Sequence, residues 1–332
     1  MTATRFDVIG IGNAIVDIIA RCDDGLLARH KLAKGHMRLI DAGELTKLYA
    51  DMGQAVETSG GSAANTIAGI ASFGGRAAFI GKVADDEFGH IFRHDIRSLG
   101  VTYETAPARS GAPTARCLVL VTPDGERTMN TFLGVSPELD HGEIDAKLVS
   151  AAAVTYLEGY LFDRPEAKRA FQQAADIARA AGRKVALSLS DGFCVDRHRA
   201  EFLDLIRTRV DILFANTSEI CSLYETESFD TALERAAKDA PLAAITRSEK
   251  GSVIVAGATR TDVPAERVAK VVDTTGAGDL YAAGFLFGHA RGLGHLAAGR
   301  LGSLAAAEAI SHIGPRPEVN LAALAHSREL LG

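Results

Sequence analysis

The sequence predicts an α/β protein with a doubly wound, mainly parallel sheet and a small β lid. Short apolar runs rich in β-branched residues alternate with alanine-rich amphipathic stretches, as in sheets covered by helices on both faces. The chain has 332 residues, of which 47% are hydrophobic and 23% charged. That length and composition predict a large buried core and argue against disorder.

Seven apolar runs are expected to be buried strands, because they are short and are separated by turn residues or helical patterns. These runs are residues 6–11, 77–80, 153–157, 184–189, 212–215, 243–246 and 251–255. Amphipathic patterns predict helices at 166–181 and 231–238, and an alanine-rich pattern predicts another at 296–310.

Two regions interrupt this alternation and predict the lid. They span residues from about 14 to 48 and from about 100 to 135. In the second region, 114–122 alternates, Pro123-Asp124-Gly125 is a turn signal, and 127–132 resumes the strand pattern. Neither region is long enough to fold alone, so residues 1–332 are read as one domain whose lid covers a ligand.

Charge and cysteine usage limit the partners of the protein. The chain has 36 Lys and Arg against 42 Asp and Glu, a net charge of −6, which argues against binding a nucleic-acid backbone. No apolar run approaches the roughly 18 residues of a membrane-spanning helix, and no signal-peptide pattern precedes the first strand. Four widely separated cysteines fit reduced thiols. We expect a cytoplasmic protein that binds a small molecule, with neither nucleic acid nor membrane as a partner.

The most informative segment is a glycine-rich turn, Gly276-Ala277-Gly278-Asp279, that leads into an apolar helix. The two glycines allow the backbone to aim consecutive N–H groups at one point, and the helix N-terminus adds positive potential, so the turn could bind an anion. Asp279 beside it could be a simple N-cap. It could also accept a hydroxyl proton during phosphoryl transfer, which needs both a base and backbone donors.

A second glycine-containing segment runs from Ser59 into a helix. Gly60 and Gly61 would let a ligand approach the backbone, and Asn65 lies about one turn into the helix. The alternative is an ordinary strand–turn–helix junction in which Ser62 is the cap.

Asp17, four residues after Asn13, interrupts an apolar run near the end of the first strand. A buried carboxylate without a partner is costly. A vicinal diol would satisfy it, because a carboxylate accepts two hydroxyl hydrogen bonds at once. A structural salt bridge would also satisfy it, and the two readings stay open.

Other motifs are weaker or absent. Asn216 and Glu219 follow the apolar run 212–215 and would share a helix face that suits metal or phosphate hydration, although a capping box is the favoured reading of this segment alone. The stretch 10–15 lacks the third glycine of a dinucleotide fingerprint, which makes a dehydrogenase a weak alternative, and Gly81-Lys82 is not followed by the Ser or Thr of a Walker A loop. The histidines show no transition-metal spacing.

Together these segments resemble the PfkB (ribokinase-like) family of carbohydrate and nucleoside kinases over essentially the whole chain. The N-terminal signature is similar to residues 60–65 with Gly74, 81–86 and Gly89. The C-terminal signature is similar to 273–279, and the Asn-x-x-Glu motif to 216–219. The resemblance implies a ribokinase-like fold with a β lid, and transfer of phosphate from ATP to a hydroxyl.

The resemblance also implies roles for individual residues. Asp279 would be the catalytic base, and the N–H groups of Gly276, Ala277 and Gly278 the anion hole. Asn216 and Glu219 would organise Mg²⁺ and phosphate through water. ATP would lie near Thr246, Arg247 and Gly251, with Ser311, His312 and Asn320 as looser candidates. A potassium site would involve Asp273 and Thr275.

The acceptor is the finer question. The pattern from Asn13 to Asp17 is similar to that of adenosine kinases, in which these side chains grip the ribose diol. The expected acceptor site is Asn13, Asp17, Gly60, Gly61 and Asn65. Adenosine, phosphorylated at its 5′-hydroxyl, is the first choice, and a sugar of the ribokinase or fructokinase type the second. An inactive sugar- or nucleotide-binding regulator is the alternative from another class. We expect a monomer or a lid-mediated homodimer.

Overall fold

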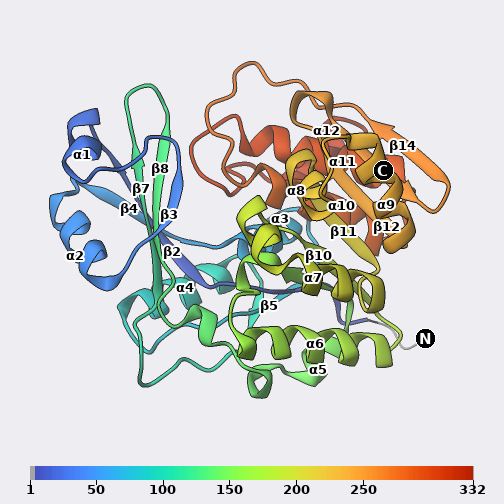
Figure 1. Cartoon of the computed structure of the whole chain (residues 1–332), viewed down its shortest axis with the longest axis horizontal. Coiled ribbons are helices and arrows are strands. Elements are labelled where there is room, and N and C mark those ends of the chain that lie inside the picture. Colours follow the sequence, from blue (N-terminus) through green and yellow to red (C-terminus); the bar gives the residue numbers. More distant parts are fainter. Residues whose placement is uncertain (1–3, 332) are drawn as a thin grey trace.

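The computed structural model describes residues 4–331 and contains two sheets. In spatial order, the larger sheet holds β14 (Thr259–Val263), β13 (Ser252–Ala256), β12 (Leu242–Thr246), β11 (Ile212–Asn216), β10 (Lys184–Ser188), β9 (Ala152–Glu158), β1 (Phe6–Ile11), β5 (Ala77–Ile80) and β6 (Thr102–Tyr103). The smaller sheet holds β3 (Met37–Leu39), β8 (Arg127–Phe132), β7 (Ala115–Val121), β2 (Ile15–Arg21) and β4 (Ala55–Gly60). Figure 1 shows the smaller sheet projecting from one side of the larger one.

All seven predicted strands of the core are present. Strands β12 through β6 pair in parallel, and β13 and β14 extend the sheet antiparallel at one edge. β1 is buried along its whole length, with Ile9 and Ile11 in the hydrophobic cluster on one face and Val8 in the cluster on the other. This explains why such strands read as continuous apolar runs.

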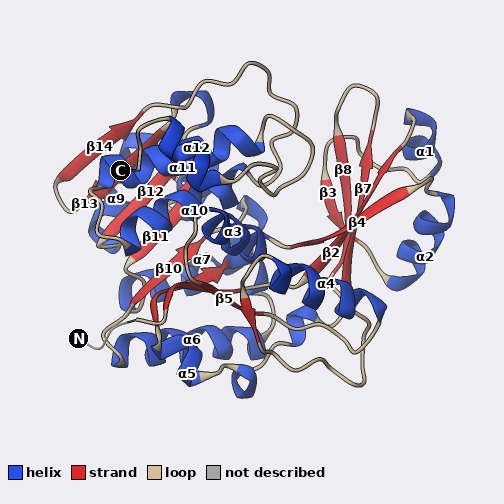
Figure 2. Cartoon of the chain, turned by 180° about the vertical axis from the view of Figure 1, so that it is seen from behind, coloured by secondary structure: helices blue, strands red, loops and turns tan. Residues whose placement is uncertain are grey.

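Helices cover both faces of the core sheet (Figure 2). One face packs against α5 (Ala146–Ser150), α6 (Pro165–Ala180), α7 (Gly192–Thr208), α8 (Thr217–Leu223) and α9 (Phe229–Asp239). The other packs against α3 (Ser62–Ser72), α4 (Glu87–Ser98), α10 (Ala277–Ala290), α11 (His295–Ala309) and α12 (Leu321–Ser327). Across residues 4–331, none of these helices has the length and apolarity to cross a membrane.

The lid differs from its prediction in extent and composition. Its first segment continues past residue 48 to β4, and it contains two helices, α1 (Asp24–Arg29) and α2 (Ala42–Asp51), where only β material was expected. Residues 102–103, assigned to the lid, form β6 of the core. β4 escaped prediction because it is an edge strand whose middle is exposed, so it lacks apolar alternation. The helices pack on the outer face of the lid, against Ile18, Leu118 and Leu120.

Both chain crossings between the core and the lid β2–β4 unit are held by one buried carboxylate. Glu158, the last residue of β9, accepts hydrogen bonds from the backbone N of Asn13 (3.1 Å), the Asn13 amide (2.7 Å) and the backbone N of Ala63 (2.7 Å). Gly61 lies between these points with φ +98°, and a Cβ there would overlap the Asn13 carbonyl oxygen. The crossing lies at the carboxyl ends of the neighbouring strands β1 and β9. The next core strands, β5 and β10, lie on opposite sides of this pair, so this is the topological switch point of the sheet.

Candidate active site

The polar residues that follow the core strands gather at one edge of the sheet. Asn13 follows β1, and Glu158, Asn216 and Thr246 end β9, β11 and β12. Because these strands are parallel, their carboxyl ends lie at the same edge, where open α/β sheets bind ligands.

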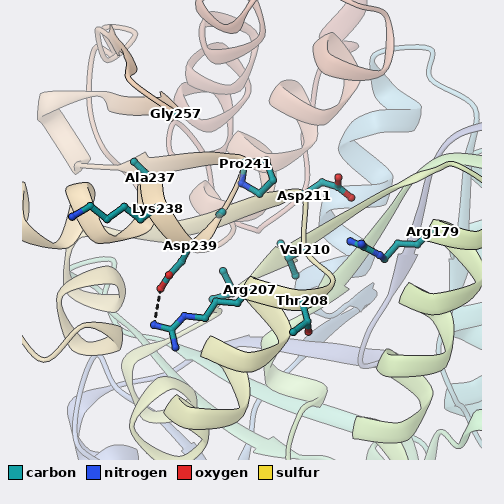
Figure 3. Close-up of a pocket in the computed structure, with 12 residues that line it drawn as sticks. Arg179, Arg207, Thr208, Val210, Asp211, Ala237, Lys238, Asp239, Pro241 and Gly257 are labelled. Carbon is teal, nitrogen blue, oxygen red and sulfur yellow. Dashed lines mark hydrogen bonds and ion pairs between the residues drawn. The ribbon is translucent and has the colours of Figure 1, made fainter.

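A pocket of about 550 Å³ lies at the opposite edge and is a different feature (Figure 3). Asp211 and Pro241, which immediately precede β11 and β12, belong to its lining. Both carboxylates of its lining are paired, since Arg207 contacts Asp239 at 3.0 Å and Asp211 contacts Lys184 at 2.8 Å. This surface is remote from the carboxyl ends of the strands and has no role in the site described below.

Asp279 lies at the third position of α10 and is bonded by side chains of α3. Ser62 Oγ donates to Asp279 Oδ1 at 2.6 Å, and Asn65 Nδ2 donates to Oδ2 at 3.1 Å. Burial raises the pKa of Asp279 to about 6, and these two hydrogen bonds oppose the rise. The carboxylate is deep in the molecule yet keeps part of its surface accessible. A partly open carboxylate with a pKa near neutrality suits a general base.

Neither capping alternative holds at this site. The N-cap of α10 is Gly276, so Asp279 does not cap the helix. The N-cap of α3 is Gly61, and no side chain caps that helix, because the Ser62 hydroxyl is directed to Asp279 instead.

The turn before α10 has the conformation of an anion cradle. Gly276 adopts φ +77°, and a Cβ on it would lie 2.6 Å from the Pro315 carbonyl oxygen, so only glycine fits. α10 then begins at Ala277, whose N–H donates to the Thr274 carbonyl at 3.3 Å, so of the three predicted donors only those of Gly276 and Gly278 are left at the turn. A Cβ on Gly278 would meet nothing within 4 Å, so the space beside this first turn of the helix is open. The cradle can therefore accept a phosphate oxygen.

An arginine of the lid contacts the loop that forms this cradle. Arg127 Nη1 lies 2.8 Å from Asp273 Oδ2, and both side chains are at most 5% exposed. Asp273 also accepts hydrogen bonds from the backbone N of Thr275 (3.0 Å) and Gly314 (3.0 Å). The positive charge beside this carboxylate is thus Arg127, where the sequence suggested a potassium ion at Asp273 and Thr275. Sequence reasoning missed Arg127, although it lies opposite inward-facing Val121 in the hairpin.

Arg127 keeps two donors without partners. Its Nε and Nη2 atoms are buried and make no hydrogen bond within residues 4–331. A buried arginine with unused donors next to an anion cradle suits a phosphate group.

Asp17 is a deeply placed carboxylate to which no protein donor is directed in the described part of the chain. Burial raises its pKa to about 6, while the charges of Arg316 and Arg127 lower it from a distance beyond direct contact. Its Oδ2 lies against Gly60, where a Cβ would overlap it. The salt-bridge reading of Asp17 is therefore wrong, and the carboxylate is free to accept hydroxyl groups from a ligand.

The surroundings of Asp17 are apolar. Asp17 lies on the same face of β2 as Ile15 and Ile19, because side chains alternate along a strand. Its neighbour on that face in the adjacent strand β7 is Cys117. The same cluster includes Val119 and partly buried Met129. A ligand held by Asp17 would therefore lie against an apolar surface.

The two asparagines predicted for the acceptor site are bonded to protein groups. The Asn13 amide donates to Glu158, and its Oδ1 is buried without a partner, so it can only accept a hydrogen bond. Asn65 donates to Asp279, and its Oδ1 accepts from Arg316 Nε at 3.3 Å. Asn65 therefore contacts the carboxylate of Asp279, and both the nitrogen and the oxygen of its amide are bonded to protein groups.

Asn216 and Glu219 form the predicted capping box. The Asn216 side chain accepts from the backbone N of Glu219, and Glu219 accepts from the backbone N (2.9 Å) and the amide (2.6 Å) of Asn216. Burial, with a smaller contribution from the charges of Asp191 and Asp279, raises the pKa of Glu219 to about 7. A cation would favour the ionised form of Glu219, which the charges of Asp191 and Asp279 disfavour, so this region fits a divalent ion with phosphate and water. Within residues 4–331 no group of three or more His, Cys, Asp or Glu forms a metal cage.

The residues predicted near ATP fall into two groups. Thr246 is the last residue of β12, and its carbonyl oxygen accepts a hydrogen bond from Thr217 Oγ1 at 3.4 Å. The Arg247 guanidinium stacks 4.6 Å above the centre of the Phe229 ring. Gly251 has φ +79° in the turn between β12 and β13. These positions adjoin Asn216 at the carboxyl edge.

The looser candidates make local contacts. Asn320 caps α12 by accepting from the backbone N of Ala323 at 2.8 Å. Ser311 Oγ donates to the Ala307 carbonyl, and His312 lies 3.2 Å from Glu308. Asn320 and Ser311 are thus bonded within the protein, whereas His312 Nε2 is buried without a hydrogen bond in the described part of the chain.

Comparisons with known proteins agree with this geometry. The model of one family, described as pfkB family carbohydrate kinase, matches residues 38–320. A crystal structure of adenosine kinase from Sinorhizobium meliloti is 56% identical, with a TM-score of 0.92 over 98% of this chain and 99% of that one. A probable sugar kinase from Rhizobium etli CFN 42 is 52% identical, with a TM-score of 0.94 over 99% and 100%. Fructokinase-1 of Oryza sativa subsp. japonica is 30% identical over 238 residues, which are 70% of this chain and 73% of that protein.

Proposed function

The chain belongs to the pfkB family of carbohydrate kinases, which are ATP-dependent, and we propose that its acceptor is adenosine, phosphorylated at the 5′-hydroxyl to give AMP. The observation that carries this proposal is Asp17. It is a carboxylate without a protein donor, set in the apolar inner face of the lid. Such a carboxylate matches a ribose diol, and the surrounding aliphatic side chains match a planar base better than they match a free sugar. The Sinorhizobium adenosine kinase, 56% identical, supports the same choice.

The catalytic step follows from the side chains around the cradle. Asp279, oriented by Ser62 and Asn65, accepts the proton of the acceptor hydroxyl as that oxygen attacks the phosphoryl group. The N–H groups of Gly276 and Gly278 in the cradle stabilise the negative charge on the transferred group. Arg127, which has two unused donors, lies beside the cradle, and its ion pair with Asp273 joins the lid to the cradle loop. A closed lid excludes water from the site and so limits hydrolysis of ATP.

The carboxylates near Asn216 suit the divalent ion that accompanies ATP. Glu219 and Asp191 would hold Mg²⁺ through water, and the ion would neutralise phosphate charge. We place the nucleotide along Thr246, Arg247 and Gly251, since these residues continue the same edge of the sheet beyond Asn216.

The direct test is release of ADP by the purified protein with MgATP and adenosine, ribose or fructose, each with and without potassium. We expect release that depends on adenosine. Because Arg127 supplies the positive charge at Asp273, we expect less than about a twofold effect of potassium. Release with fructose or ribose but not with adenosine would overturn the nucleoside assignment and keep the kinase.

We expect kcat to fall on the acid side with an apparent pKa near 6. Asp279 must be ionised to accept a proton, and burial raises its pKa to about 6, so the active fraction falls about tenfold per pH unit below that value. The measurement is kcat at saturating adenosine and MgATP between pH 5 and 8.5, with circular dichroism at each pH as the control for unfolding. A kcat that stays constant down to pH 5 would contradict the assignment of Asp279 as the base.

A sugar kinase is the second candidate function. The 30% identity to a rice fructokinase and the 52% identity to a Rhizobium probable sugar kinase favour it. An inactive binding protein fits less well, because Asp279, its two donors and the open cradle form a complete set of groups for phosphoryl transfer.

A further inference from the structure

We propose that Arg316, in the segment between α11 and α12, is a positioning residue that links the two halves of the site: it fixes the Asn65 amide against Asp279 and brings its charge near Asp17. The inference rests on the proposed kinase function, but it does not depend on which acceptor is used. Sequence reasoning did not single out Arg316, and nothing in the family resemblance assigns it a role.

The backbone on both sides of Arg316 is anchored. Before it, the backbone N of Gly314 donates to Asp273 at 3.0 Å, and Pro315 packs against Gly276. After it, the backbone N of Glu318 donates to Glu308 at 3.0 Å. The anchors on the N-terminal side are parts of the anion cradle itself, so the position of Arg316 is set relative to the catalytic turn.

The guanidinium then bridges the lid and α3. Its Nη1 donates to Ser59 Oγ at 2.6 Å, and its Nε donates to Asn65 Oδ1 at 3.3 Å. Arginine has only donors, so it selects the orientation in which the oxygen of the Asn65 amide faces it. In that orientation the Asn65 NH₂ group faces Asp279, to which it donates at 3.1 Å. A flipped amide would instead direct its oxygen at the carboxylate and repel it.

The charge of Arg316 acts on the acceptor side. Its partner Ser59 precedes Gly60, against which Asp17 Oδ2 lies, so the guanidinium is near Asp17 although no ion pair joins them. In keeping with this placement, Arg316 is the largest influence that lowers the pKa of Asp17. Burial lowers the pKa of Arg316 to about 10, so it remains protonated at neutral pH. The other charged groups around the pair are Asp95 on α4, Arg127 on β8 and Asp279 on α10. Arg316 therefore helps Asp17 to stay ionised without occupying the oxygens that a ligand needs.

The test is a double-mutant cycle with Arg316→Met, Asn65→Ala and the combined variant, assayed with whichever acceptor the wild-type enzyme phosphorylates. We expect Arg316→Met to lower kcat about 10- to 100-fold. We expect the same substitution to lower kcat less than threefold when Asn65 is already alanine, because Arg316 then has no amide to orient. Equal losses in both backgrounds would overturn the positioning role.

The pH profile of kcat/KM tests the electrostatic effect of Arg316 on Asp17. Removing the charge should shift the acid limb of kcat/KM for the acceptor upward by about one pH unit, since Asp17 then protonates more easily. Arg316→Lys keeps the charge and should leave that limb near its wild-type place while still lowering kcat. An unchanged limb in Arg316→Met would overturn the electrostatic role, and Arg316→Gln, which also removes the charge, supplies the comparison if Arg316→Met does not fold.

A control variant and the activity of wild type separate failure of the Arg316 role from failure of the proposed function. Arg300→Met removes an exposed arginine from α11 and should change neither parameter. A wild-type enzyme that phosphorylates no acceptor would overturn the proposed function, and the role of Arg316 with it. An active wild-type enzyme with an additive cycle would overturn the role of Arg316 alone.

Discussion

Asp279→Asn is expected to lower kcat by roughly 10³- to 10⁴-fold while the protein stays folded. The amide is nearly the same size as the carboxylate and can still accept the hydrogen bond that Asn65 donates to it. On the other side, the Ser62 hydroxyl can rotate and accept a hydrogen bond from the new NH₂ group. The substitution therefore removes the proton acceptor and little else.

The effect should be on kcat much more than on KM, because the proton is transferred only in the transition state. The measurement is steady-state ADP release with the acceptor varied, together with circular dichroism to confirm the fold. Asp230→Asn, which removes an exposed carboxylate from the first turn of α9, is the matched control and should stay near the wild-type rate. Turnover of Asp279→Asn within about tenfold of wild type would contradict the assignment of Asp279 as the base.

The extent to which the sequence predicts this site depends on how local each interaction is. Gly276 and Asp279 lie three residues apart in one turn, and the conformation that makes the cradle requires glycine at position 276. Their chemistry could be read from the chain, as could that of Asn216 and Glu219, whose capping box is also local. What could not be read was that Ser62 bonds Asp279 across 217 positions of sequence rather than capping its own helix.

The residues missed by sequence reasoning act across long sequence separations. Glu158 immediately follows the predicted strand 153–157, and an acid at the carboxyl end of a buried strand was a usable signal. Its contacts to Asn13 and Ala63, however, depend on which strands are neighbours in the sheet. Arg316 lies between two prolines in a segment without periodicity, and nothing local indicates that it points inward. The same reasoning applies to β4, whose edge position removes the apolar pattern that made the central strands predictable.

Asp17→Asn is expected to raise KM for adenosine about 100-fold or more, with a much smaller change in kcat. The wild-type carboxylate can accept a hydrogen bond from each of two hydroxyl groups, and such charge-assisted bonds contribute about 1.5–3 kcal/mol each. In the variant the acceptor is a neutral amide, and its NH₂ end is a donor that cannot accept a hydroxyl hydrogen bond. Because the ribose is held equally in the ground state and the transition state, most of the loss falls on binding. Glu57→Gln, an exposed carboxylate on the neighbouring lid strand, is the matched control. An unchanged KM for every nucleoside and sugar would remove Asp17 from the acceptor site.

The same substitution should stabilise the ligand-free protein at neutral pH. The pKa of Asp17 is raised in the fold from 3.8 to about 6, so the folded state binds the proton more tightly than the unfolded state does. The contribution of the protonated group is therefore fully present below pH 3.8 and is lost as the pH rises through 6, which leaves an ionised carboxylate that costs roughly 1–3 kcal/mol at pH 7.5. Thermal denaturation should show Asp17→Asn melting a few degrees above wild type at pH 7.5, with the difference shrinking toward pH 4.5. Saturating adenosine at pH 7.5 should make wild type melt above Asp17→Asn. Only the wild-type carboxylate then accepts hydrogen bonds from both ribose hydroxyl groups, and this binding stabilises the folded state. A variant less stable than wild type at pH 7.5 without ligand would mean that Asp17 supports the fold rather than the ligand.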